Sequence, residues 1–204
     1  GAGMMKMYGN RALRWIAEFY IWLFRGTPVL IQLIIIYTGL PQLGIRLSVI
    51  ESAIIGLALN EGAYLAEVIR SGIMSVDKGQ TDASRAVGMT WRQRMWMVIL
   101  PQATRTIIPP LGNQFNGMLK TTSLASVISM EELMRNAQML AQIEFRVLEA
   151  YTVAAVWYLV LVSIWGQIQV RIEAHYEKPF GPAAAVSPDA KKDIEKILRN
   201  SGQA

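Results

Sequence analysis

Polar side chains with helical spacing interrupt two strongly apolar stretches of this sequence. They are Asn60, Tyr64 and Glu67 in the first, and Asn113, Asn116 and Lys120 in the second, which continues into Thr121, Thr122 and Ser123. Residues three, four and seven positions apart lie on one face of a helix. Each set therefore predicts a polar stripe, and two facing stripes would line a polar passage through an apolar protein.

Other chemistry has little support in the sequence. The chain has no cysteine and a single histidine, His175, which we interpret as a surface or interfacial residue, so no metal cluster is expected. No Gly-x-x-x-x-Gly-Lys-Ser/Thr phosphate-binding loop is present, so the chain is not expected to hydrolyse ATP itself. An intramembrane enzyme would have only carboxylates to work with.

The composition is that of a membrane protein. Hydrophobic residues make up 52% of the 204 residues and charged residues 17%, whereas a soluble domain has about 25% charged residues. The net charge of +5 comes from basic residues grouped at 6–14, 70–105 and 171–199. If the apolar segments cross alternately, these groups lie on one side of the membrane, as the positive-inside rule requires. Without interleaved aromatic residues, they do not indicate nucleic-acid binding.

Four stretches are long enough to cross a bilayer, which takes about 20 residues each. They span residues 17–40, 48–74, 97–128 and 148–170. Pro28 is expected to kink or begin the uninterrupted part of the first, and the Pro109-Pro110 pair to break or bend the third. Carboxylates in the second should face protein or water, because charges are costly in hydrocarbon. In the last, Trp165 is interpreted as an interface anchor.

The two ends of the chain suggest its domain organisation. The abrupt polar opening, which begins at Gly1, predicts a preceding membrane helix that is missing from this sequence. Residues 1–178 form the predicted transmembrane domain. Residues 179–204 are expected to be a cytoplasmic tail, with a linker and a short amphipathic helix at 189–199.

A polar insertion at residues 75–100 carries two helix-start signals. Asp77 with Gln80, and Thr90 with Gln93, have the spacing of capping boxes. Gly88 can adopt the left-handed conformation that ends a helix. The insertion is thus predicted to form two short helices separated by a tight turn. The alternative is a solvated basic loop.

Small side chains follow the first cap, in a segment that another protein can approach closely. The residues concerned are Asp82, Ala83, Ser84, Ala86 and Gly88. The acidic Asp82 also suits the positive end of a helix dipole. This segment is therefore predicted to be a docking surface.

Six motifs in order resemble the permease subunits of polar amino-acid importers in the ATP-binding cassette superfamily. They start at Phe24 (FRGTP), Asn60 (NEGAY, with EVIRSGI from Glu67), Lys78 (KGQ), Leu100 (LPQA), Pro109 (PPLGNQF) and Leu119 (LKTTSL). The insertion resembles the EAA coupling loop of that family, which sits in a cleft of the ATPase. Here Asp82-Ala83-Ser84 stands where Glu-Ala-Ala is usual, Val98 where Ile is usual, and Asp77 where Pro is frequent.

The resemblance implies an assembly and a substrate class. Two permeases, identical or homologous, would join two ATPases that hold ATP and Mg²⁺, together with an extracytoplasmic amino-acid-binding protein. An amino acid carries an ammonium and a carboxylate, and both need partners on desolvation. Glu67 would receive the ammonium, and Lys120 with the three hydroxyl groups after it the carboxylate. Alternatively, Glu67 pairs with Arg70 or a neighbouring helix, and Lys120 extends to the membrane interface.

We therefore predict an all-α integral membrane protein, a bundle of about five transmembrane helices with a cytoplasmic coupling helix. It is a multi-pass permease of the bacterial cytoplasmic membrane with its C-terminus in the cytoplasm. It binds lipid and substrate, no nucleic acid and no cofactor of its own. An ion-coupled secondary transporter that uses Glu51, Glu61 and Glu67 is the main alternative.

Overall fold

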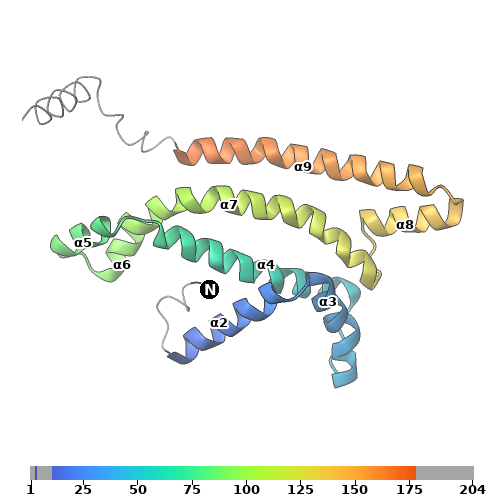
Figure 1. Cartoon of the computed structure of the whole chain (residues 1–204), viewed down its shortest axis with the longest axis horizontal. Helices are drawn as coiled ribbons and strands as arrows, with labels where there is room; N and C mark the ends of the chain where they lie inside the picture. The colour runs from blue at the N-terminus through green and yellow to red at the C-terminus, as the bar shows by residue number, and fades with distance from the viewer. Residues whose placement is uncertain (1–2, 4–10, 178–204) are drawn as a thin grey trace, which may run out of the picture.

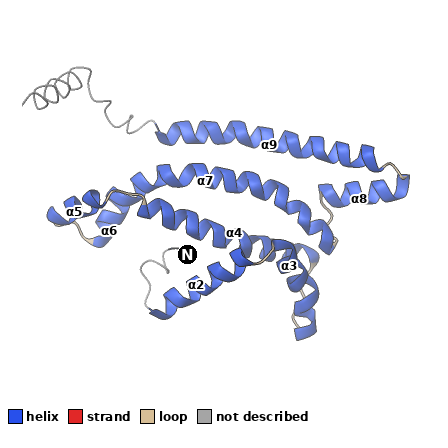
Figure 2. Ribbon diagram, in the orientation of Figure 1, coloured by secondary structure: helices blue, strands red, loops and turns tan. Residues whose placement is uncertain are grey.

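The chain is helical throughout the part that the structure describes, which is residue 3 and residues 11–177 of a computed structural model (Figures 1 and 2). The α-helices are α2 (Arg11–Gly26), α3 (Val29–Ile34), α4 (Val49–Met74), α5 (Lys78–Ala86), α6 (Trp91–Arg94), α7 (Leu100–Thr121), α8 (Leu133–Glu144) and α9 (Val147–Glu177). Shorter π and 3-10 turns cover Ile35–Gly39, Leu40–Leu43, Met95–Ile99 and Thr122–Ile128. The all-α prediction is confirmed. The predicted tail at 179–204 lies outside the described residues.

Three long helices form the body of the molecule, with α7 packed between α4 and α9 (Figure 1). Among the described residues, α4 and α9 are long and apolar enough to cross a membrane. Only 6% of the apolar stretch of α9 is buried inside the chain, against 39% for α4. Helix α9 therefore offers most of its apolar surface to lipid or to other proteins.

The first predicted crossing is divided at Pro28, where the sequence indicated a kink or the start of the uninterrupted part. Helices α2 and α3 meet at Thr27-Pro28 with a bend of 105°, and the pair counts as a third span only if the bent pieces are taken together. Proline lacks an amide hydrogen, so the carbonyl of Phe24, four residues earlier, loses its helical partner. The expected effect of Pro28 is confirmed, but the bend is larger than a kink.

Two side chains donate hydrogen bonds to the Phe24 carbonyl, which lacks a helical partner because of Pro28. Asn60 Nδ2 donates to Phe24 O at 3.0 Å, and Gln32 Nε2 donates to the same oxygen at 3.0 Å. Asn60 Nδ2 also donates to Gln32 Oε1 at 3.0 Å. Both amides are buried, at 7% exposure for Gln32 and 8% for Asn60. They satisfy the helix end and hold the bend against α4.

Helix α7 runs without a break through Pro109 and Pro110, so of the two predicted outcomes, a break or a bend, the structure has the bend. It is curved along its length, as Figure 1 shows. Curvature relieves the ring clash with the preceding turn, and packing on both sides stabilises the helix where hydrogen bonds are lost. Gly112 of α7 adjoins the side chain of Gln169 of α9 so closely that a Cβ there would overlap with it.

Trp165, interpreted from the sequence as an interface anchor, also joins α9 to α7. Its Nε1 donates to the carbonyl of Gly112 at 2.9 Å, and its ring centroid lies 4.1 Å from that of Phe115. A buried indole usually finds such a partner. The predicted interface residue therefore also contributes to helix packing.

Candidate functional site

The insertion at 75–100 folds as the two short helices α5 and α6, as predicted. Asp77 caps α5, and its side chain accepts from Gly79 N at 2.7 Å. Gln80 does not complete the expected capping box. Its Oε1 instead accepts from Gln102 Nε2 of α7 at 3.2 Å, a contact 22 residues away in the sequence. This bond joins the first turn of α5 to the long helix beside it.

The turn between the two helices has the hydrogen bonds of a Schellman motif. Met89 N donates to Ser84 O at 3.1 Å, and Gly88 N donates to Arg85 O at 2.9 Å. Gly88 has φ of +78°, where a Cβ would be strained, so its predicted conformation is confirmed. Helix α6 then begins with the predicted box, in which Thr90 and Gln93 cap each other.

The small residues of α5 divide between two faces. Ala83 and Ala86 are exposed, and so is Asp82, whose contact with Arg85 is a surface pair at 3.7 Å. Ser84 is buried at 5% exposure and donates to Thr81 O at 2.8 Å. One face of α5 thus offers little bulk to an approaching protein, while Ser84 packs inward.

One buried cluster joins both ends of the insertion. Ile73 lies five residues before α5 begins at Lys78, while Met95 and Ile99 lie in the π turn that leads into α7. They pack with Ala103 and Ile107 of α7. The insertion is therefore fixed at its two ends to α4 and α7, so that a displacement of α5 would be passed to both helices.

The polar stripe on α4 is largely used by contacts within the chain. Glu67 forms an ion pair with Arg70, the alternative that the sequence itself offered. The Arg25 guanidinium lies 5.2 Å above the ring of Tyr64. Asn60 holds the bend at Phe24, as described above. These three side chains have structural partners in the isolated chain.

The stripe on α7 is more exposed to solvent than the stripe on α4. Lys120 is exposed in the last turn of the helix, and Asn116 has a buried Oδ1 without a hydrogen-bond partner. Asn113 is exposed, and its Oδ1 accepts from Gln169 Nε2 of α9 at 3.3 Å. A side-chain hydrogen bond between α4 and α7 joins Gln114 to Glu61, and neither residue belongs to a predicted stripe. This contact between the two helices therefore lies outside both stripes.

The hydroxyl groups after Lys120 turn back onto their own backbone. Thr121 donates to Gly117 O at 3.1 Å, Thr122 to Leu119 O at 2.9 Å, and Ser123 to Lys120 O at 2.7 Å. Their donors are thus engaged in the helix, but each oxygen keeps acceptor capacity. They can receive a hydrogen bond from a ligand without a change in backbone.

A comparison with known protein families gives a match over most of the chain. Residues 1–177 match the family described as binding-protein-dependent transport system inner membrane component. The chain belongs to this family.

Among curated relatives, this permease is 44% identical over 179 residues to the probable amino-acid ABC transporter permease protein PatM of Vibrio harveyi, covering 86% of the chain and 80% of the relative. It is 42% identical over 190 residues to the arginine transport system permease protein ArgU of Corynebacterium glutamicum, with 86% of the chain matched. The chain spans 60% of the length of that second protein.

A solved structure described as an amino acid ABC transporter with histidines superposes with a TM-score of 0.81. The two are 38% identical, and the match covers 85% of the permease and 81% of that chain. A methionine ABC transporter in an inward-facing conformation shares the fold at 19% identity, with a TM-score of 0.70. The comparisons support a transport subunit, and they do not favour the ion-coupled alternative or an enzyme.

Sequence reasoning missed three residues that organise the permease. Gln32 caps the bend, Gln169 reaches Asn113, and Gln114 Nε2 donates to Glu61 Oε2 at 2.8 Å between α7 and α4. The bond to Glu61 agrees with the expectation that carboxylates of this crossing face protein or water, but its partner Gln114 was not predicted. A signal was available for Gln32, because Pro28 leaves the Phe24 carbonyl without a partner and an amide within an apolar run is a ready donor.

Proposed function

We propose that this permease forms, with a second permease subunit, the membrane pathway of an ATP-driven importer for a polar or charged amino acid. Relatives whose names specify arginine, glutamine or cystine transport support this substrate class. Two ATPase subunits supply the energy, and an extracytoplasmic binding protein delivers the substrate. The membrane is the bacterial inner membrane, and the α5–α6 end and the C-terminus lie in the cytoplasm.

The exposed face of α5 carries the proposal. Helix α5 is short, begins at the Asp77 cap and is followed by the left-handed Gly88. Its exposed side chains Ala83 and Ala86 are small, so a cleft in an ATPase can enclose the helix. The buried cluster around Ile73 and Met95 then passes its movement to α4 and α7. ATP binding would draw two such helices together and open the paired permeases outward, and hydrolysis would reverse the change.

The substrate pathway is assigned to the open stripe of α7. Lys120 is placed to receive a carboxylate, whereas Asn116 Oδ1 and the three hydroxyl oxygens can accept hydrogen bonds from the ammonium of the substrate. Asn113 continues the stripe toward the end of α7 that is nearer α5. On α4, Tyr64 and the Glu67 pair border the pathway, and Asn60 keeps the bend of the neighbouring helices in place.

A photocrosslinking experiment tests the docking assignment. The chain has no cysteine, so single substitutions Ala83→Cys, Ala86→Cys and Ser84→Cys can each carry a cysteine-specific benzophenone reagent. In the assembled transporter, the first two should crosslink to the ATPase subunit with yields that change on addition of ATP. Ser84→Cys is the matched control, because this side chain is buried in the same helix.

The outcomes separate the alternatives. Crosslinks from positions 83 and 86 to the ATPase, at several times the yield from position 84, support the coupling role. An absence of ATPase crosslinks from both alanine positions in an assembled, active complex would overturn it, and the insertion would then be a solvated basic loop.

A further inference from the structure

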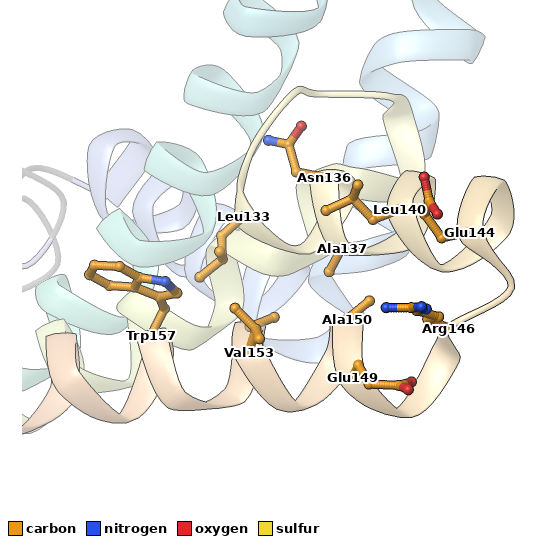
Figure 3. Close-up of a pocket in the computed structure, with 11 residues that line it drawn as sticks. Leu133, Asn136, Ala137, Leu140, Glu144, Arg146, Glu149, Ala150, Val153 and Trp157 are labelled. Atoms are coloured by element: carbon orange, nitrogen blue, oxygen red, sulfur yellow. The ribbon is translucent and has the colours of Figure 1, made fainter.

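An apolar groove lies between α8 and the first turns of α9, at the end of the molecule opposite α5 (Figures 1 and 3). Its volume is about 330 Å³. Leu133, Ala137 and Leu140 of α8 form one wall, and Val153 and Trp157 of α9 lie along the other (Figure 3). The proposed transport cycle does not use this groove.

The groove has one charged end. Glu144, Arg146 and Glu149 lie where α8 turns into α9, whereas Trp157 lies at the far end (Figure 3). A guanidinium binds phosphate with two parallel hydrogen bonds. Carboxylates accept from a primary ammonium, which has three donors. One cation and two anions at the mouth therefore complement a headgroup that carries both a phosphate and a primary ammonium.

The length of the groove matches one leaflet of a bilayer. Arg146 and Trp157 are eleven residues apart, which is about 16 Å along a helix that rises about 1.5 Å per residue. Half of a hydrocarbon core about 30 Å thick is about 15 Å. The apolar span of α9 begins at Val147, directly beside the mouth. The charged end thus lies at headgroup depth when Trp157 lies near the bilayer centre.

The surroundings of the mouth are apolar and exposed. Ile143 is 71% exposed, Phe145 89% and Leu148 78%. Large apolar side chains gathered at a protein surface mark a contact with membrane or protein. Here they lie beside the charged mouth. Apolar and charged side chains thus meet at this place, as the acyl chains and the charged headgroup of a phospholipid meet at the membrane boundary.

We propose that this groove binds one acyl chain of a phosphoethanolamine lipid, with its phosphate at Arg146 and its ammonium at Glu149. The bound lipid fills the space between α8 and α9 and fixes α8 against the membrane-spanning helix. The site is separate from the substrate stripe of α7 and from the docking face of α5.

Lipid retention by the intact transporter tests the groove. The complex is reconstituted in vesicles of equal parts phosphatidylethanolamine, phosphatidylcholine and phosphatidylglycerol, extracted, and examined by native mass spectrometry. Val153→Trp fills the groove and should lower retained phosphatidylethanolamine at least five-fold. Val156→Trp is the matched control, because this valine is 53% exposed but does not line the groove, and it should retain lipid as the unaltered protein does. Equal retention by both variants would overturn the proposal.

A second pair of variants tests the headgroup. Glu149→Gln should reduce the preference for phosphatidylethanolamine over phosphatidylcholine, which has no ammonium hydrogen to donate, by about five-fold. Glu131→Gln, an exposed carboxylate at the same end but outside the groove, should leave the preference unchanged. An unchanged preference in Glu149→Gln would overturn the assignment of the ammonium.

The occupant can be identified directly without filling the groove. A photoreactive benzophenone amino acid in place of Leu140, in the assembled transporter in the same vesicles, should crosslink to lipid of the mass of phosphatidylethanolamine. A crosslink to another protein chain at this position would overturn the proposal and assign the groove to a protein contact.

Discussion

Lys120 is the exposed cation at the end of the polar stripe on α7, and the pathway proposal depends on it most directly. Lys120→Met keeps the length of the side chain but removes its charge. A hydrogen bond to a charged group contributes about 1.5–3 kcal/mol, so the KM for amino-acid uptake into vesicles should rise about 10- to 150-fold. Lys120→Arg, which keeps the cation, should retain most of the affinity. Unchanged affinity in Lys120→Met would remove this residue from the pathway.

Individual residues were predictable where their partners are close in sequence. The caps at Asp77 and Thr90 and the left-handed Gly88 follow from local backbone rules, and the structure has all three. Gln80 fits the same local rule but bonds to Gln102 instead. That partner becomes available only when α5 lies beside α7, so spacing alone cannot reveal it.

At the scale of elements, the bend between α2 and α3 depends on Asn60. Asn60→Leu removes both hydrogen bonds of Nδ2, to Phe24 O and to Gln32 Oε1, at a buried site. Gln32 Oε1 then loses its donor, whereas Phe24 O keeps its bond from Gln32 Nε2. One buried acceptor left without a donor costs about 1–3 kcal/mol, so the thermal midpoint should fall and the bend should loosen. Spin labels on Trp22→Cys and Ile35→Cys, both exposed positions, should give a broader distance distribution in the variant.

Asn136→Leu is the matched control, since this asparagine is exposed and its Nδ2 donates within α8 and its cap, to Glu132 O at 3.0 Å. It should leave the distance distribution unchanged. A narrow distribution in Asn60→Leu would show that Gln32 alone holds the bend.

The helices themselves were largely predictable, but the size of the bend at each proline was not. Pro28 and the Pro109-Pro110 pair present the same local signal, a ring without an amide hydrogen. At Pro28 the chain bends by 105°, whereas α7 continues through Pro109 and Pro110. The difference lies in tertiary contacts: Gln32 and Asn60 satisfy the open carbonyl at the bend, while α7 is packed between α4 and α9.

At the scale of the whole molecule, the two ends of the helical body differ in basic residues. Residues 77–94 contain four, Lys78, Arg85, Arg92 and Arg94, whereas residues 131–149 contain two, Arg135 and Arg146. Figure 1 places α5 and α6 at the opposite end from α8. Helix α4, with 26 residues, is about 39 Å long at about 1.5 Å per residue, enough to cross a core about 30 Å thick.

The positive-inside rule therefore places α5 and α6 in the cytoplasm and the start of α8 outside. In cells that express the assembled transporter, a membrane-impermeant maleimide should label Glu131→Cys without treatment. Arg92→Cys should be labelled at least ten-fold more after permeabilisation than before. Both positions are exposed, so access to the protein surface does not distinguish them. The reverse labelling pattern would place α5 outside the cell, where it could not meet an ATPase. Equal labelling of both positions before permeabilisation would mean that α4 does not separate the two ends across the membrane.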